Sequence, residues 1–472
     1  MKKSLPVFLL LLIIVGALIA SRVWVYHSSQ GDGAALSFEQ GGNNGQNPGS
    51  GPGTGTGQNP DTDEEDRLLA QQIAAEEREA MLADRRIEVL DVSRLLFRGY
   101  FYEEAIDLLN ADEDIINFET QELEAEILEA VEDLELFNGE IKHIFFHSLI
   151  LYPEVLFPNL SVPTGGYNEG FIYQSELFRL LPQLLERGYV LYDIKDIFSK
   201  DTSGVMRQND IYLPAGKRPL VISIDDPSYH YGQRFVSGGT GQTGGFDRSR
   251  TPGAGFANRV LLDENGELAT EVITPDKETI ITYDGDVHIV IDAFVKEHPE
   301  FSFRGSKGII ASTGYMGIFG YDLPDLHTEG IRQEVIAICD KFKENGWHFA
   351  SHSYTHNRDG YWGPGSLPAN ISRDTRRWRE EIEPIVGQTN LFIAPFGFLL
   401  RGESLQVILD NEFDIYCTVD FTQPVHVYDK YAVMGRIEIG GYSLSRYVST
   451  LNRDFFDVES VKDSQRPPIL SN

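Results

Sequence analysis

Short apolar runs of strand length alternate with amphipathic segments of helical length from residue 141 onward. In residues 174–187, five leucines recur at the three- and four-residue steps that place them on one helical face. We expect strands at 141–146, 189–192, 220–224, 309–311, 347–350, 391–394 and 415–419, and helices at 174–187, 328–345, 372–385 and 405–411. This alternation predicts a mainly parallel sheet wrapped by helices.

One long stretch, residues 229–288, interrupts the alternation. It holds a glycine-rich run at 238–255 and segments typical of hairpin strands, with turn sequences at 264–266 (Glu-Asn-Gly) and 284–285 (Asp-Gly). Because it follows the strand expected at 220–224, we interpret it as an insertion that borders the carboxyl ends of the parallel strands.

The chain before residue 139 has a different pattern. Leu123, Ile127, Val131 and Leu134 step by four, four and three residues, which places them on one face of a helix. We therefore expect residues 61–138 to be helical, in an order that resembles a single tetratricopeptide-type hairpin. A repeat array needs about three such units, so we interpret this segment as a spacer or as a docking segment for a protein partner.

Negative charge is concentrated in the same segment. Residues 61–135 contain 25 Asp or Glu, 6 Arg and no Lys, a net charge of −19 out of the chain's −32. Such a face is usually solvated. Binding to a nucleic-acid backbone depends on clustered Lys and Arg, so nucleic acid is not an expected partner.

The first 60 residues predict attachment to a membrane. Two lysines precede an apolar run at 5–20, which is typical of a signal anchor, and the residues before Ala20 make a poor cleavage site. We expect residues 1–27 to form a single-pass anchor in the cell membrane, with the rest of the chain outside the cytoplasm. Secretion after cleavage is the alternative. Residues 28–60, rich in Gly, Asn, Gln and Pro, predict a flexible linker.

Two stretches carry the candidate chemistry. An apolar run ends in the adjacent carboxylates Asp225 and Asp226, and His352 and His356 stand four apart later in the chain. If residues 352–356 are helical, both imidazoles face the same way and can bind one ion. Taken singly, the carboxylates also fit a turn and the histidines also fit an exposed surface. Together they suit one divalent metal with open positions for water and substrate.

The chain from residue 141 onward resembles the polysaccharide deacetylases, carbohydrate esterase family four or NodB homology domain. Their first motif, Thr-Phe-Asp-Asp-Gly, is matched by residues 223–227 (Ser-Ile-Asp-Asp-Pro), and their second, His-Ser/Thr-x-x-His, by residues 352–356. The strand at 142–148 is similar to the first strand of many bacterial members. The resemblance covers residues 139–472 and implies a distorted (β/α)7-type barrel.

The resemblance also implies roles for individual residues. Asp226, His352 and His356 would hold one divalent ion, with zinc favoured and cobalt, manganese or nickel as alternatives. Asp225 would be the general base that takes a proton from water.

Three departures from the family pattern affect this site. Pro227 replaces the glycine after the Asp pair, which removes a backbone N–H. The third motif, Arg-x-Pro-Tyr/Phe-Gly, has Ile393 in place of the arginine that holds the base, although Pro395-Phe396-Gly397 keep its end and would contribute to substrate binding. The Leu-x-His motif, source of the general acid, is not evident. Arg436-Ile437-Glu438 occupies the comparable strand, and His426 is the one histidine nearby that could substitute.

We therefore expect a metal-dependent hydrolase that removes N- or O-linked acetyl groups from a cell-wall or matrix polysaccharide, such as peptidoglycan or a polymer of N-acetylglucosamine. Losing a positioned general acid costs about 10²–10⁴ in rate. The alternative is accordingly a weak or inactive deacetylase-like protein that binds glycan as a scaffold at the cell surface.

Overall fold

The computed structural model describes residues 60–157, 159–230, 233, 255–422 and 424–470. They belong to two compact units, the first containing residues up to Phe97 with Tyr102–Leu128, and the second containing Arg98–Phe101 with the chain from Glu129. The predicted anchor and nearly all of the predicted linker lie outside the described residues. Among the helices that can be described, none is both long and apolar enough to cross a bilayer.

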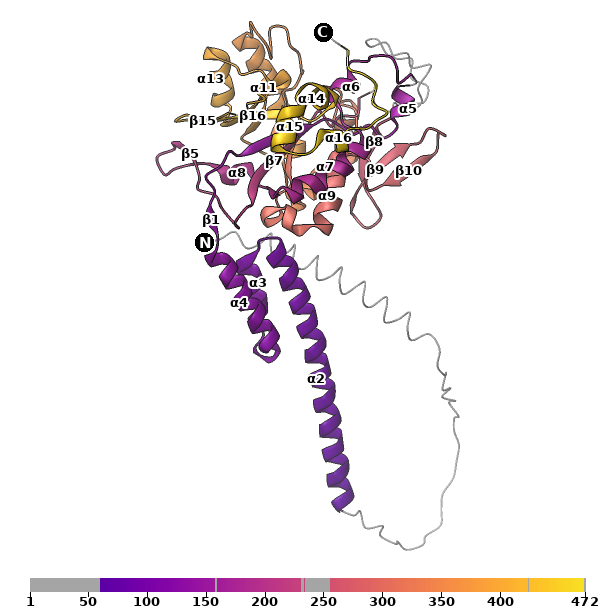
Figure 1. The fold of residues 1–472 in the computed structure, drawn as a ribbon, viewed down its shortest axis with the longest axis vertical. Coiled ribbons are helices and arrows are strands. Elements are labelled where there is room, and N and C mark those ends of the chain that lie inside the picture. Colours follow the sequence, from indigo (N-terminus) through magenta and orange to yellow (C-terminus); the bar gives the residue numbers. More distant parts are fainter. Residues whose placement is uncertain (1–59, 158, 231–232, 234–254, 423, 471–472) are drawn as a thin grey trace, which may run out of the picture. The chain divides into compact units, whose positions relative to one another are not determined.

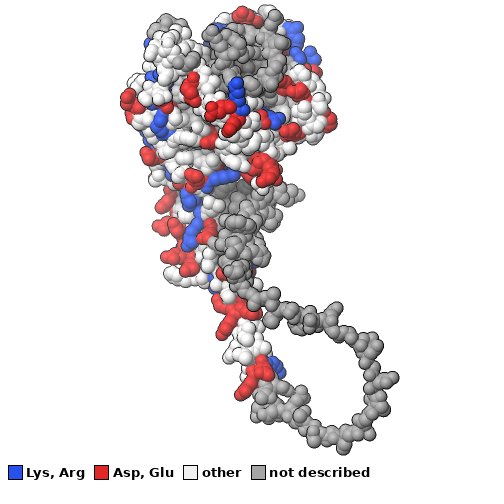
Figure 2. Space-filling view, turned by 90° about the vertical axis from the view of Figure 1, so that its right-hand side faces the viewer, with Lys and Arg blue, Asp and Glu red and all other residues white. Residues whose placement is uncertain are grey.

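The first unit is helical. It consists of α2 (Pro60–Arg98), α3 (Tyr102–Leu109), a short 3₁₀ helix (Glu113–Ile115) and α4 (Phe118–Glu132). The second half of α2 and one face each of α3 and α4 form its core, in which the buried residues are Val89, Leu90, Val92, Leu96, Tyr102, Ala105, Leu109, Leu123 and Ile127. The first half of α2 is exposed, and acidic side chains line the unit, as Figure 2 shows in red.

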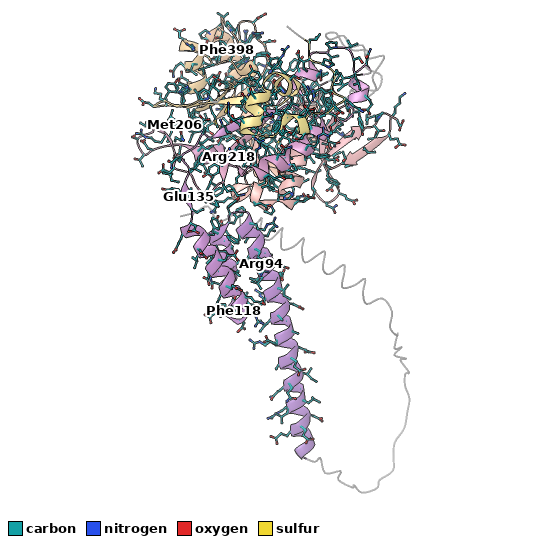
Figure 3. All side chains as sticks on the ribbon, in the orientation of Figure 1. Arg94, Phe118, Glu135, Met206, Arg218 and Phe398 are labelled. Atoms are coloured by element: carbon teal, nitrogen blue, oxygen red, sulfur yellow. The ribbon has the colours of Figure 1, made fainter. Side chains whose placement is uncertain are left out.

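The second unit is built on a closed barrel of seven parallel strands (Figure 1). Around the barrel the order is β2 (Lys142–Phe146), β7 (Arg218–Asp225), β11 (Gly308–Ser312), β12 (Trp347–Ser351), β13 (Leu391–Ile393), β14 (Ile415–Val419) and β16 (Ala432–Glu438), which pairs with β2. Arg218, where β7 begins, is labelled in Figure 3. The predicted (β/α)7-type barrel is confirmed.

Helices cover the outside of the barrel, because parallel strands need a crossover between them. The longer ones are α7 (Gln174–Glu186), α9 (Val287–Glu297), α10 (Glu329–Glu344), α11 (Pro368–Glu381) and α13 (Gly402–Asp410). The helix predicted at 372–385 is divided into α11 and α12 (Glu383–Val386), since Pro384 cannot donate to a continuous helix. Cys339 on α10 and Cys417 on β14 are free thiols in separate clusters of the core.

The interior of the barrel changes from apolar to polar along its strands. Side chains on a strand alternate between the two faces, and on β7 Leu220, Ile222 and Ile224 pack outward with the helices while Val221 packs inside. Ser223 and Asp225 follow Val221 on the inner face, and both are buried. The carboxyl ends of the strands therefore surround a polar mouth.

The insertion contains an antiparallel sheet of β8 (Ala257–Leu262), β9 (Leu268–Ile273) and β10 (Thr279–Thr282). The predicted turn at 264–266 connects β8 to β9. The second turn lies at 274–278, where Lys277 donates its N–H to the Thr274 carbonyl. The chain also bends at 284–285, but this bend leads from β10 into α9, which Asp286 caps, and does not connect two strands. Outside the ring, β3 (Tyr189–Leu191) pairs with the start of β7, and β15 (Val425–Val427) pairs with β16.

Candidate metal centre and active site

Strand β7 delivers two adjacent carboxylates to the barrel mouth. Asp225 is its last residue, and only 3 % of Asp225 is exposed. Asp226 leaves the strand with a left-handed backbone (φ 56°), and Pro227 then offers no N–H to extend the ladder. The chain turns at this point, so one carboxylate stays inside the barrel while the side chain of the other is 26 % exposed.

His352 and His356 come from the loop that follows β12. The condition of a helix at 352–356 is not met, because Ser353 and His356 have positive φ angles of 67° and 49°. Asp374 on α11 holds the loop instead, since its carboxylate accepts the backbone N–H groups of Tyr354 and Thr355 at 2.7 and 2.9 Å. The two imidazoles therefore converge through a fixed turn rather than through helical periodicity.

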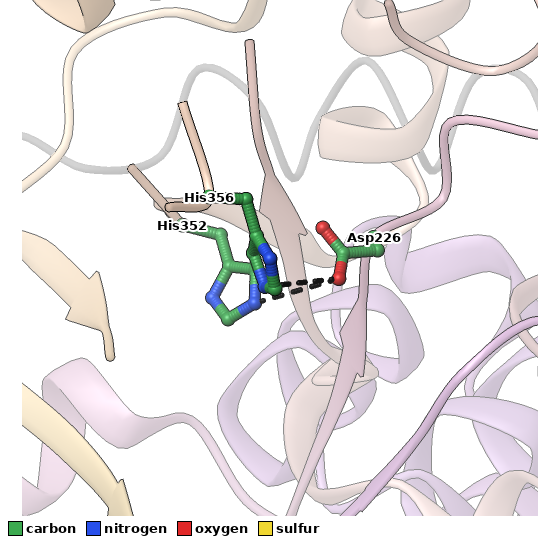
Figure 4. Close-up of side chains that lie close together, drawn as sticks. All are labelled: Asp226, His352 and His356. Atoms are coloured by element: carbon green, nitrogen blue, oxygen red, sulfur yellow. Dashed lines mark ion pairs between the residues drawn. The ribbon is translucent and has the colours of Figure 1, made fainter. Parts of the chain in front are cut away.

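Asp226, His352 and His356 bring one donor atom each to a common point, and these atoms lie within 4.8 Å of one another (Figure 4). Asp226 Oδ2 is 3.3 Å from His356 Nε2 and 3.7 Å from His352 Nε2. Ligands that share one zinc ion at about 2.0–2.1 Å lie roughly 3.4 Å apart in a tetrahedron. The spacing of Asp226 and His356 therefore matches what a single ion requires, and that of Asp226 and His352 is slightly longer.

Two further observations fit a cation at this point. Asp226 Oδ1 is buried without a hydrogen-bond partner in the described chain, which is unusual for a carboxylate oxygen. His352 Nδ1 lies 2.8 Å from the Ile393 carbonyl, so it carries the proton and leaves the Nε2 lone pair free for a metal. Burial also lowers the pKa of His352, which favours the neutral imidazole that a metal binds.

Arg436 on β16 holds the Asp225 carboxylate. Its two terminal nitrogens lie 2.8 and 3.0 Å from the two carboxylate oxygens, and the guanidinium is fully buried 4.1 Å from the centre of the Phe145 ring. Burial alone would raise the pKa of Asp225, but the opposing influences, of which the positive charge of Arg436 is the largest, outweigh it and bring this pKa to about 2. The carboxylate is therefore ionised and fixed in orientation.

Arg436 supplies from β16 the cation that Ile393 cannot supply from β13. Residues 436–438 were expected on a strand, but Arg436 was given no role. A sequence signal for one was present, because Arg436 stands among mostly apolar residues of this strand. A fully buried arginine needs an anionic partner, and Asp225 is that partner.

The remaining predicted residues lie at different places. Pro395–Gly397 form a 3₁₀ turn after β13, and the Phe396 ring lies 4.6 Å from the His356 ring. His426 is exposed on β15 and pairs with Val433, near the start of β16. Glu438 ends that strand, about 17 Å further along at 3.3 Å per residue. The structure therefore brings the 395–397 turn to the mouth, but it does not bring His426 there.

A chain of aromatic rings, here called the aromatic rim, runs beside the three convergent donor atoms. Neighbouring ring centroids are 4.6 to 6.5 Å apart, in the order His147, Phe171, Tyr167, His230, Tyr315, His356 and Phe396. Two of its members, Tyr315 and Phe396, are 45 % and 51 % exposed. Exposed aromatic rings next to a polar site offer a flat apolar surface to a ligand.

No protein-family model matches the chain, and no curated protein matches its sequence. Among solved structures it is similar to the Streptococcus pyogenes deacetylase PplD, a de-N-acetylase from Aggregatibacter actinomycetemcomitans and a polysaccharide deacetylase from Bacillus cereus. PplD is 10 % identical with a TM-score of 0.35, and the match covers 64 % of this chain and 93 % of PplD. The Aggregatibacter enzyme is 11 % identical with a TM-score of 0.35, covering 66 % of this chain and 98 % of that one. The Bacillus cereus protein is 10 % identical with a TM-score of 0.34, covering 67 % of this chain and 69 % of that one. At these values, function has to be argued from the site itself.

Proposed function

We propose that this protein is a metal-dependent hydrolase that removes acetyl groups from a polysaccharide. One observation carries the proposal, namely that three converging donor atoms stand beside an ionised, arginine-held carboxylate at the same barrel mouth. Structural zinc sites are usually closed by four protein ligands, whereas three ligands leave a position open for chemistry. A positioned carboxylate beside an open site is the arrangement that hydrolysis needs.

The donor set favours zinc, because two imidazoles and one carboxylate with an open position form a common catalytic zinc site. Cobalt, manganese and nickel accept similar ligands. A divalent ion bound by Asp226, His352 and His356 would supply Lewis-acid chemistry by polarising an acetyl carbonyl and activating a water.

Asp225 acts as the general base in this proposal. Its Oδ2 lies 3.9 Å from His352 Nε2, so the carboxylate and the metal ligands border the same small space. Arg436 occupies the side of the carboxylate that faces into the barrel and prevents it from rotating. Asp225 takes a proton from the water that attacks the acetyl carbon, and acetate is released with cleavage of the bond to the sugar.

The aromatic rim supports a sugar as the substrate. A pyranose ring has apolar C–H faces, and the exposed rings of Tyr315 and Phe396 stand on either side of His356. We propose a cell-wall or matrix polysaccharide, such as peptidoglycan or a polymer of N-acetylglucosamine. The proposed setting is the outer side of the cell membrane, with residues 1–27 as anchor and residues 61–138 as a spacer or docking segment.

Acetate release from acetylated chitooligosaccharides and from peptidoglycan tests this function, using the purified full-length chain with and without added zinc. We expect zinc-dependent release that Asp225→Asn abolishes while bound zinc, measured by mass spectrometry, stays constant. Asp226→Asn should lose both zinc and activity. Glycan binding without any acetate release would reject the hydrolase and favour a glycan-binding scaffold instead.

A further inference from the structure

Glu438, the last residue of β16, lies on the side of the mouth away from the three convergent donor atoms. Its neighbour on β2 is Phe145, and the neighbour of Phe145 on β7 is Ser223. Arg436, two residues earlier on the same strand, points inward to Asp225, and residues two apart on a strand share a face. Glu438 therefore reaches the mouth one layer above the Arg436–Asp225 pair.

His147 stands between Glu438 and Asp225. Phe146 on β2 is level with Ile224 on β7, so the next residues, His147 and Asp225, leave adjacent strands at the same height. Adjacent strands are about 4.8 Å apart. The order around the mouth is therefore Glu438, His147, Asp225 and then the convergent donors.

Glu438 has an unusual set of contacts for a carboxyl group. Among the described residues its one ion-pairing partner is His147, whose Nδ1 lies 3.4 Å from Glu438 Oε1. The same Nδ1 lies 2.9 Å from the Gly170 carbonyl, which accepts its proton. A Cβ on Gly170 would lie 3.2 Å from Glu438 Oε1, so the loop packs closely over the carboxyl group. The nearest guanidinium, Arg436, is committed to Asp225.

This environment favours the protonated form of Glu438. Partial burial raises its pKa, and the opposing influence of His147 is smaller, although 21 % of the Glu438 side chain is exposed. A carboxyl group with a raised pKa is a better proton donor near neutral pH.

We propose that Glu438 is the proton donor of the reaction, with His147 as the residue that positions it. The inference rests on the proposed function. Water adds to the acetyl carbon as Asp225 takes one of its protons, the bond from that carbon to the sugar nitrogen breaks, and Glu438 gives its proton to the departing nitrogen. The products are acetate and the free amine, and exchange with solvent moves the proton from Asp225 and reloads Glu438.

The test compares two acetyl substrates whose leaving groups differ in their need for a proton. An acetylated chitooligosaccharide releases an amine, which must be protonated, whereas 4-nitrophenyl acetate releases a stable phenolate. For the full-length zinc-loaded chain, we expect Glu438→Gln to lower kcat on the oligosaccharide by about 10²–10⁴ and to leave ester cleavage within a few-fold. Glu344→Gln, the same change at an exposed position at the end of α10, should leave the ratio of the two activities unchanged.

Equal losses on both substrates, or no loss on either, would reject the role of Glu438 while leaving the deacetylase function intact. Absence of activity in the parent chain on both substrates would instead reject the proposed function. Zinc content and the urea midpoint of Glu438→Gln show whether the variant is folded, and Glu438→Asp, which restores a carboxyl group, should recover part of the oligosaccharide activity. His147→Gln should lower oligosaccharide turnover and displace the alkaline limb of its pH profile, which a purely structural change would not move.

Discussion

Asp225 is buried and Glu438 is half-buried; the two carboxyl groups lie at one barrel mouth on strands separated by β2 alone, and their surroundings push their pKa values in opposite directions. On the β7 side, Arg436 directs both of its terminal nitrogens to Asp225 and brings the pKa of that carboxyl to about 2. On the β16 and β2 side, the ion-pairing partner of Glu438 among the described side chains is the imidazole of His147, and burial raises the pKa of Glu438. The position of one guanidinium therefore separates a carboxyl group with a lowered pKa from one with a raised pKa.

The largest expected effect comes from removing that guanidinium. Arg436→Met leaves the Asp225 charge buried and unpaired, so we expect a loss of about 3–5 kcal/mol in the free energy of unfolding. Urea denaturation measures this loss. Arg376→Met, which breaks an exposed ion pair with Glu380 on α11, is the matched control and should leave the urea midpoint unchanged. A small effect of Arg436→Met would mean that Asp225 does not depend on its arginine.

The second largest effect is expected from zinc, which should stabilise the chain through the donor residues and independently of Glu438. Zinc at 100 times its dissociation constant should raise the free energy of unfolding by about 2.7 kcal/mol, because the folded chain binds it and the unfolded chain does not. We expect Asp226→Asn and His352→Gln to abolish this gain and Glu438→Gln to keep it. Thermal unfolding with zinc and with a chelator provides the measurement. Loss of the zinc response in Glu438→Gln would show that the two sides are not independent.

The pH dependence of stability should show opposite signs for the two carboxyl groups in the metal-free protein. The folded pKa of Asp225, about 2, lies below the ordinary 3.8, so its contribution of about 2 kcal/mol is present above pH 4 and lost as the pH falls toward 2. The folded pKa of Glu438 is raised above 4.5, so its contribution is present at acid pH and lost as the pH rises through that pKa.

Variant curves of unfolding free energy against pH test these signs. Relative to the parent chain, Asp225→Asn should be less stable at pH 7 than at pH 2, whereas Glu438→Gln should be more stable at pH 8 than at pH 4. If the stability of both variants relative to the parent changed in the same direction with pH, the pKa values of Asp225 and Glu438 would not be shifted in opposite directions.

The local parts of this site could be predicted from the sequence, and the parts that depend on strand pairing could not. Asp225 with Asp226, and His352 with His356, each lie within a few residues, and the two pairs taken together marked them as candidate donors. Arg436 reaches Asp225 only because β16 pairs with β2, and β2 with β7, to close the ring. No spacing within the chain encodes that contact.

The parallel sheet wrapped by helices followed from the alternation of strands and helices, whereas its closure into a barrel was expected from the family resemblance. The backbone geometry that brings the two histidines together could not be predicted in this way. Four-residue spacing brings two histidines together if the stretch is helical, whereas the backbone turns through positive φ angles at Ser353 and His356. The tertiary contact with Asp374 stabilises this turn. His352 and His356 therefore converge through a loop rather than through a helix.

Asp374 provides a smaller test of the donor side. Its carboxylate accepts two backbone N–H groups of the histidine loop, so Asp374→Asn should loosen the loop and weaken zinc binding about tenfold, as residues that support metal ligands typically do. Competition with a chromophoric chelator measures the dissociation constant. Asp410→Asn on α13 is a control that should leave zinc affinity unchanged, because the Asp410 side chain accepts from Gln406 at the surface.

The smallest expected effect lies in the aromatic rim, which both sides of the mouth share. Phe396→Ala and Tyr315→Ala remove exposed rings next to His356, and a sugar packed on one ring is worth about 1 kcal/mol, or roughly fivefold in KM. We expect KM for a long oligosaccharide to rise by this amount with kcat unchanged, since neither ring holds the base or the proton donor. Tyr428→Ala, an equally exposed tyrosine beside β15, should change neither constant. A fall in kcat instead would show that the rings position the acetyl group, and the rim would then belong to the same catalytic unit as Asp225 and Glu438.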